Sequence, residues 1–211
     1  MIDYEDPPYG SYDLIDDTDP GWRRAHPDAK GVTRVAGGLF TTTFTVGSDM
    51  SSGSLGEEQA LEKMIADYNA SGNPGRFTLK REGADRFAVV GIGIRDSSGN
   101  DEAVAPVLDT RISLPLQERD VVQAMKLISQ AVSEKSSYRV EPGNAPTNLA
   151  IQTKVKVGGS NLNARELLAQ VAAATRLRTI WLLLYDADNG CFFMNMEIAT
   201  QTASHASGPR R

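Results

Sequence analysis

Apolar and polar positions alternate with two different periods in the second half of the chain. A period of about 3.6 residues predicts a helix, and a period of two predicts a strand. The expected elements are a strand at Asp109–Leu114, a helix from about Gln117 to Lys135, strands at Tyr138–Val140 and Thr147–Val157, a helix from Ala164 to about Thr175, and strands at Thr179–Tyr185 and Phe192–Ile198. This order, β-α-β-β-α-β-β, predicts a two-helix αβ subdomain over residues 108–198.

The two long strands of this half differ in their patterns. Thr147–Val157 alternates apolar and polar residues, so one of its faces should be wet, and Gly158-Gly159 should end it. Thr179–Tyr185 is apolar on both faces, which predicts a central strand covered on both sides. Asp188-Asn189-Gly190 predicts a tight hairpin turn after it.

The first half predicts a smaller αβ subdomain over residues 37–107. Its elements are a strand at Gly38–Val46, a helix that Ser54-Leu55-Gly56-Glu57 opens as a capping box, strands near Arg76–Lys80 and Arg86–Ile94, and a short strand at Ala103–Val107. The fold class is therefore α+β, with three main helices on short mixed or antiparallel sheets. Whether residues 37–107 and 108–198 share one sheet is left open.

The two ends of the chain lack sustained periodicity. Residues 1–36 predict an irregular arm that is both acidic and aromatic, and residues 199–211 predict a disordered tail. The aromatic side chains of the arm are Tyr4, Tyr9, Tyr12 and Trp22. The arm is expected either to dock on its own domain or to complete the surface of a protein partner, since Tyr and Trp are enriched at interfaces.

Composition narrows the classes of function. The 211 residues carry 22 Lys and Arg and 27 Asp and Glu, a net charge of −5. The first 20 residues hold seven of these acids and no base, so the remainder is nearly neutral and lacks the basic surface that nucleic-acid binding needs. The longest apolar run, Ile180–Tyr185, is too short to span a membrane, which predicts a soluble protein. The single cysteine, Cys191, excludes an intrachain disulfide and is expected to be a small packed residue.

No catalytic, cofactor-binding or metal-binding residue is assigned, and no cofactor is expected. His26 and His205 lie in the arm and the tail, which favours solvated residues over an acid–base site. The acids Asp13, Asp16, Asp17 and Asp19 lack the ligand spacing of a calcium loop, and Asp186–Gly190 is better explained as a hairpin turn. Gly91-Ile92-Gly93 indicates a strand with a bulge or a close backbone neighbour rather than a dinucleotide loop.

Three motifs occur in the order found in an uncharacterised group of exported bacterial, largely acidobacterial, proteins. They are Tyr4-Glu5-Asp6-Pro7, Asn73-Pro74-Gly75-Arg76-Phe77 and Ala164-Arg165-Glu166-Leu167-Leu168. The chain resembles this group over nearly its whole length. The element order of residues 109–198 also resembles the small modules at the N-termini of secretins and signalling TonB-dependent transporters. The first resemblance implies an exported protein, whose leader would precede Met1 or has been removed.

The sequence therefore predicts a non-enzymatic protein-interaction or scaffold module of the bacterial cell envelope. A periplasmic or extracellular location is implied by the resemblance, and a cytoplasmic one is the alternative. The other function left open is an enzyme or small-ligand carrier whose site is formed by Asp, Glu and Arg residues distant in sequence.

Overall fold

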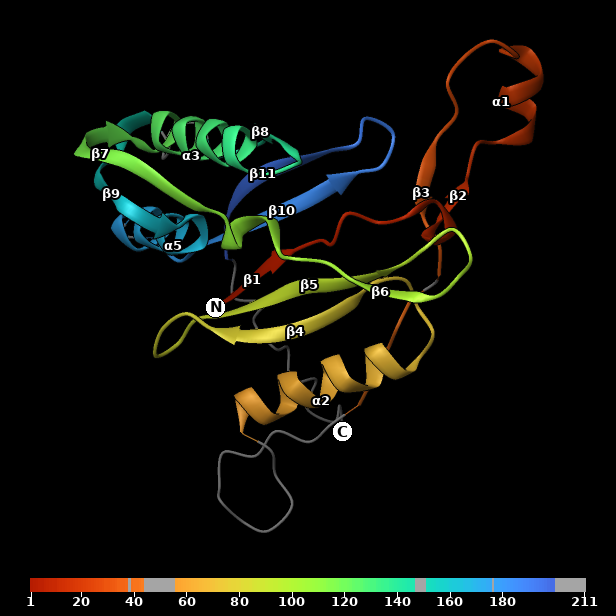
Figure 1. The fold of residues 1–211 in the computed structure, drawn as a ribbon, viewed down its shortest axis with the longest axis horizontal. Helices are drawn as coiled ribbons and strands as arrows, with labels where there is room; N and C mark the ends of the chain where they lie inside the picture. The colour runs from red at the N-terminus through yellow and green to blue at the C-terminus, as the bar shows by residue number, and fades with distance from the viewer. Residues whose placement is uncertain (38, 44–55, 147–150, 176, 200–211) are drawn as a thin grey trace, which may run out of the picture.

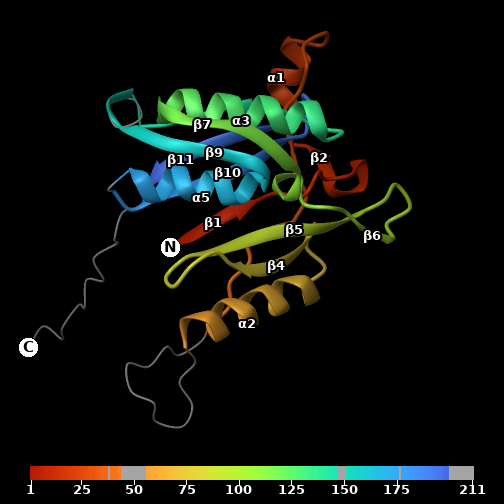
Figure 2. The ribbon, with the colours of Figure 1, turned by 60° about the vertical axis from the view of Figure 1, so that its left-hand side comes forward.

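The chain forms an α+β fold, as the sequence predicts. The computed structural model describes residues 1–37, 39–43, 56–146, 151–175 and 177–199. Its three main helices are α2 (Glu57–Ala70), α3 (Val121–Lys135) and α5 (Ala164–Ala174). Figures 1 and 2 show α3 and α5 beside one part of a large mixed sheet and α2 beneath another part.

The main sheet is joined at its centre by β1 (Ile2–Glu5). The strand order is β4-β5-β1-β10-β11-β8, with β6 paired to β5. The bounds are β4 Arg76–Arg81, β5 Phe87–Arg95, β6 Asp101–Ala103, β8 Arg139–Pro142, β10 Thr179–Asp186 and β11 Cys191–Ile198. β1 lies parallel to both β5 and β10. The two expected subdomains, 37–107 and 108–198, therefore share one sheet, and β1 is the strand that connects them.

The prediction of an irregular arm at residues 1–36 is wrong for β1 and for two further strands. Ile2 and Tyr4 face α2, whereas Asp3 and Glu5 face the core on the other side of the sheet. A strand with buried carboxylates lacks the apolar signal that usually marks a central strand, so its pattern resembles that of a polar loop. β2 (Leu14–Asp16) and β3 (Thr33–Val35) form a separate antiparallel pair around the short helix α1 (Pro20–Ala25).

The larger core lies around α3 and α5. On one side of these helices is the main sheet, and on the other is an antiparallel ribbon of β7 (Arg111–Asp120) and β9 (Lys154–Asn163). The largest fully buried side chains include Trp181 and Phe192 from the sheet and Ile128 and Leu168 from the helices. This layered packing buries the apolar stripe of each helix, which is the main source of its stability.

The predicted first-half elements need three corrections. Residues 39–43 form no strand, and the rest of the strand predicted at Gly38–Val46 lies outside the described residues. Gly56, not Ser54, is the N-cap of α2, and its N–H donates to the Gln59 side chain (3.2 Å). The short strand predicted at Ala103–Val107 lies instead at Asp101–Ala103, and Val107 begins a turn of 3₁₀ helix at Val107–Asp109. The strands predicted near Arg76–Lys80 and Arg86–Ile94 are confirmed as β4 and β5.

In the second half, strand pairing extends β7 and β9 beyond their predicted limits. β7 continues through Pro115 to Asp120, so α3 begins four residues later than the expected Gln117. Asp120 is its N-cap and accepts the N–H of Gln123 (2.8 Å). β9 covers only the end of the strand predicted at Thr147–Val157 and then passes through Gly158-Gly159. Residues 151–152 form a helical turn, and 147–150 lie outside the described residues.

Arg119 stabilises the irregular part of the β7–β9 ribbon. The pairing of β7 with β9 shifts register between Leu114 and Gln117. The buried guanidinium of Arg119 donates to the carbonyls of Val157 (2.8 Å) and Pro115 (2.9 Å) there. Pro115 lies within this shift and Val157 pairs with Gln117 at its end, so the arginine adds donors to backbone carbonyls where the ladder is irregular.

Arg119→Met is expected to lower the free energy of unfolding by roughly 2–3 kcal/mol, because it removes the charged donors of two backbone carbonyls at a buried, irregular part of the ribbon. Arg111→Met is the matched control, since Arg111 lies on the same strand but is exposed. The measurement is chemical denaturation followed by circular dichroism. Equal losses for the two variants would contradict the assigned role of Arg119.

Gly91 permits the close approach of the segment that follows β1. A β-carbon at Gly91 would overlap with the backbone nitrogen of Pro7. The close backbone neighbour is one of the two explanations that the sequence offers for this glycine-bearing strand, the other being a bulge. Gly91→Ala is expected to lower the free energy of unfolding by roughly 1–3 kcal/mol through overpacking. Gly83→Ala is the control, because its nearest contact would be an ordinary 3.7 Å; urea denaturation of both variants is the test.

In the described part of the chain, no helix is long and apolar enough to cross a membrane.

Candidate functional site

The two buried carboxylates of β1 meet two arginines in the centre of the molecule. Asp3 and Glu5 are fully buried. Nε and Nη2 of Arg86 lie 2.5 and 2.6 Å from the Asp3 carboxylate, and Nη2 of Arg165 lies 2.5 Å from that of Glu5. A backbone N–H group also donates to each carboxylate. A buried charge is stable only when it is paired. These ion pairs therefore hold β1 in the sheet in addition to its backbone pairing with β5 and β10.

Arg165 connects most of the elements around this centre. It follows Asn163, the N-cap of α5, whose side chain accepts the Arg165 N–H (2.9 Å). Nη2 of Arg165 also lies 3.1 Å from Asp109, which pairs with Lys80 at 2.6 Å. The guanidinium stands 5.5 Å from the ring of Trp181. Although burial raises the pKa of Asp109, the Lys80 hydrogen bond and the Arg165 charge hold it below its usual value.

Glu82 is the one acid of this centre that accepts no hydrogen bond from the described residues. Its carboxyl oxygens lie 3.6 Å from Nε of Arg86 and 3.8 Å from Nε of Arg165, and they accept no hydrogen bond from the described residues. Burial, together with the neighbouring Asp3 carboxylate, raises the pKa of Glu82 to about 8. Glu82 is therefore mostly protonated at neutral pH.

We call these seven residues the buried charge network: Asp3, Glu5, Lys80, Glu82, Arg86, Asp109 and Arg165. With Glu82 protonated, the network contains three carboxylates and three cations, so its net charge is zero. It opens to a cavity of about 280 Å³ lined in part by Lys80, Asp109, Asn163 and Glu166. Nη1 of Arg165 has no hydrogen-bond partner among the described residues. The side chains of Lys80, Asp109, Asn163 and Glu166 give this cavity polar donors and acceptors for a small molecule.

Asp6 anchors the chain beyond β1 without a cation in the described structure. Its carboxylate accepts the hydroxyls of Tyr4 (2.8 Å) and Tyr9 (3.1 Å) and the N–H of Tyr185 (2.9 Å). Burial raises the pKa of Asp6, although these hydrogen bonds oppose the shift. Burial and then the Asp6 charge raise the pKa values of both tyrosines. The first part of the arm therefore docks on its own domain.

One half of the sheet lacks a helix on the α2 side. α2 lies against β4, and no equally close helix covers β10 and β11 on that face within the described residues. We call the uncovered side chains the open sheet face: Ile2, Ile180, Leu182, Leu184 and Phe193. Ile2 is 43% exposed and Leu184 is 39% exposed. The prediction that Thr179–Tyr185 is covered on both sides is therefore wrong for this face.

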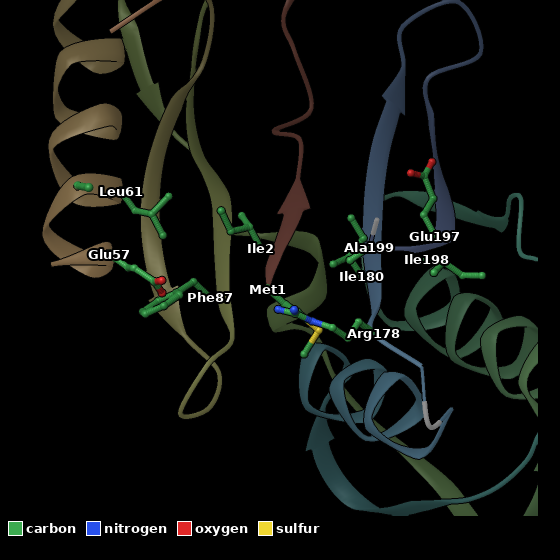
Figure 3. A pocket seen from close by; sticks show the side chains of 11 residues that line it. Met1, Ile2, Glu57, Leu61, Phe87, Arg178, Ile180, Glu197, Ile198 and Ala199 are labelled. Atoms are coloured by element: carbon green, nitrogen blue, oxygen red, sulfur yellow. The ribbon is translucent and has the colours of Figure 1, made fainter. Parts of the chain in front are cut away.

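A groove of about 630 Å³ opens at one end of the open sheet face (Figure 3). Leu61 of α2 and Phe87 of β5 form one wall, and Ile180 of β10 forms part of the other, with Ile2 between them. Glu57, Glu197 and Arg178 stand at its rim. A second hollow of about 510 Å³ lies at the other end, beside Leu184 and Phe193.

Residues 14–35 project from the body as a finger made of β2, α1 and β3 (Figure 1). At its base, the buried Asp13 carboxylate lies 2.7 Å from Nε of Arg95. No residue of α1 is buried. The exposed large side chains of the finger are Ile15, Trp22 and Val32, and Tyr12 is exposed beside its base.

The other residues considered from sequence, where the structure describes them, lie in turns, caps, ion pairs or the core. His26 is exposed and stacks on Trp22, and His205 lies outside the described residues. Cys191 is fully buried, as predicted. Three of the four clustered acids serve the finger: Asp16 pairs with Arg23, Asp17 pairs with Arg34, and Asp19 caps α1. Asp186 accepts the N–H of Asn189 in the predicted hairpin turn. Among the described residues, no group of His, Cys, Asp or Glu could hold a metal ion.

Sequence reasoning missed the residues of the buried charge network because they are brought together from five separate segments. At the level of sequence, the motif Tyr4-Glu5-Asp6-Pro7 carries only a resemblance. A usable signal was the acidic pair Asp3 and Glu5, which share one strand face and require buried cations if that strand is central. Comparison with protein-family models, with curated proteins and with solved structures finds no match to this chain.

Proposed function

We propose that this chain is a non-enzymatic protein-interaction or scaffold module of the bacterial cell envelope, and that the finger contacts its partner protein. The envelope setting is supported by the resemblance to exported proteins. The order of elements from β7 to β11 also agrees with that of the secretin and transporter modules. The exposed apolar side chains of the finger are the observation that supports a protein interaction.

The finger exposes large apolar side chains to solvent that are not buried against the rest of the described chain. Val32 is 58% exposed and Trp22 is 40% exposed, while Ile15 also faces solvent. A two-stranded ribbon has little stability alone, and this one is supported by the ion pairs Arg23–Asp16 (2.6 Å) and Arg34–Asp17 (3.0 Å). Aromatic and apolar side chains on a polar scaffold are typical of the centre of a protein interface.

The described chemistry favours binding over catalysis. Nδ1 of His26 lies 3.1 Å from the carbonyl of Trp22, at an exposed position. Cys191 is inaccessible to a substrate because it is fully buried. Most carboxylates and arginines at the centre already pair with one another, which is typical of a structural network.

The test is co-purification from an envelope extract of the organism that encodes the chain. The tagged chain should retain a partner, and the double variant Trp22→Ser/Val32→Ser should retain at least tenfold less of it. Leu116→Ser is the matched control, since Leu116 is 61% exposed but lies on β7, away from the finger. Equal retention by all three proteins, or the absence of any partner, would reject the proposed role of the finger.

A second candidate function is binding of a small polar ligand at the cavity of the buried charge network. It is favoured by the polar side chains that line this cavity, among them Lys80, Asp109 and Asn163. Titration with a panel of amino acids, followed by NMR, should then shift the amide signals of Lys80, Asn163 and Glu166. Unchanged signals throughout the panel would remove this candidate for that class of ligand.

A further inference from the structure

The open sheet face has the form of a second helix-binding position. α2 packs on the neighbouring part of the same face, where its buried Ile65 contacts Phe77 and Val89. A helix that packs beside another lies about 8–10 Å from it. The next such position lies over β10 and β11, where Ile180, Leu182 and Leu184 point outward.

The dimensions and side chains of this position suit a short helix. From Ile180 to Leu184 the strand extends for about 13 Å, which corresponds to roughly nine residues of helix. The two hollows at the ends, about 630 and 510 Å³, provide room for larger side chains. Phe193 widens the apolar area on the adjacent strand, where it pairs with Leu184. An apolar stripe on the incoming helix would cover these residues.

The charges at the rim favour basic residues on that helix. Glu57 and Glu197 line the first hollow together with Arg178 and Met1, which carries an ammonium group, and Asp186 lines the second, so the acids outnumber the cations by three to two. In the described structure neither glutamate forms an ion pair, so both are free to meet cations. We propose that the open sheet face binds an amphipathic helix of a partner protein, with an apolar stripe flanked by lysine or arginine. This surface is separate from the finger.

The proposal is tested with a synthetic helical peptide of about 14 residues, the length of α2, with leucine at helical spacing and flanking lysines. A second peptide carries glutamate in place of lysine. Fluorescence anisotropy should show that the intact chain binds the basic peptide at least tenfold more tightly than the acidic one. Leu184→Glu should weaken binding of the basic peptide at least tenfold.

Two variants serve as controls. Leu116→Glu adds the same charge at an exposed leucine on the ribbon and should leave binding unchanged, as should Trp22→Ser in the finger. The second control also separates this proposal from that for the finger. Circular dichroism checks that Leu184→Glu is folded. If it is not, Glu197→Lys is used in its place and should likewise weaken binding of the basic peptide.

Other occupants give different results, each of which would overturn the proposal. If only a chain ending at residue 199 binds the peptide, the chain's own last residues cover the face. If Leu184→Glu converts a dimer to a monomer, the occupant is a second copy. If the variant weakens binding to anionic vesicles but not to the peptide, the face contacts a membrane. Equal affinity for both peptides, or no binding, would also reject it.

Discussion

Arg165→Met is expected to lower the free energy of unfolding by about 3–5 kcal/mol, the largest loss that we predict for one substitution. The change leaves the buried Glu5 carboxylate without its cation, which lies 2.5 Å away in the intact chain. It also removes one of the two cations that pair with Asp109. An unpaired buried charge is far more costly than the pair is stabilising, so the loss should exceed the intrinsic strength of the bond. Urea denaturation is the measurement.

The matched control is Arg81→Met, which removes an exposed ion pair with Glu58 (2.9 Å) and should cost at most about 1 kcal/mol. The double variant Glu5→Leu/Arg165→Met should recover part of the loss, because both charges are then absent. A loss for Arg165→Met as small as that of the control would mean that Arg165 and Glu5 are solvated in the folded chain.

Stability is expected to fall as the pH rises from about 5.5 to about 8, and Glu82 is expected to account for up to roughly 3 kcal/mol of this fall. The pKa of Glu82 is raised from 4.5 to about 8 by burial and by Asp3. The folded chain therefore holds a proton that the unfolded chain has released. This contribution to stability is fully present below pH 4.5 and is lost as the pH rises through about 8.

The measurement is the free energy of unfolding as a function of pH for the intact chain and for Glu82→Gln. Burial also raises the pKa values of Asp3, Glu5 and Asp6, so the intact chain contains contributions of the same sign. The difference between the two proteins isolates Glu82. The variant should show a flatter profile with its advantage greatest above pH 8, and parallel profiles would show that Glu82 is ionised at neutral pH.

Local patterns predicted the elements whose buried face is apolar. Leu167, Leu168 and Val171 mark α5, and Asn163 marks its start, because a cap and a stripe are set by neighbouring residues. The alternation of Phe192, Met194 and Met196 marks β11 in the same way. The sequence also predicted the hairpin turn at Gly190, whose φ of 59° suits glycine.

Long-range contacts decided the features that local patterns do not encode, namely the length of β7 and the exposed face of β10. Pairing with β9 carried β7 through Pro115 to Asp120, although the local signal there favoured a helix. The exposure of Leu184 could likewise not be predicted from the sequence, since a strand that is apolar on both faces does not indicate which face a helix covers.

By itself, the sequence determined the α+β class, the three main helices and most strands of the second half, because each depends on residues close together in the chain. Only the tertiary structure showed that β1 joins the two halves and that Asp3 and Glu5 meet Arg86 and Arg165. The physical reason is that a buried carboxylate is stable only beside a cation, and these cations lie more than 80 residues further along the chain.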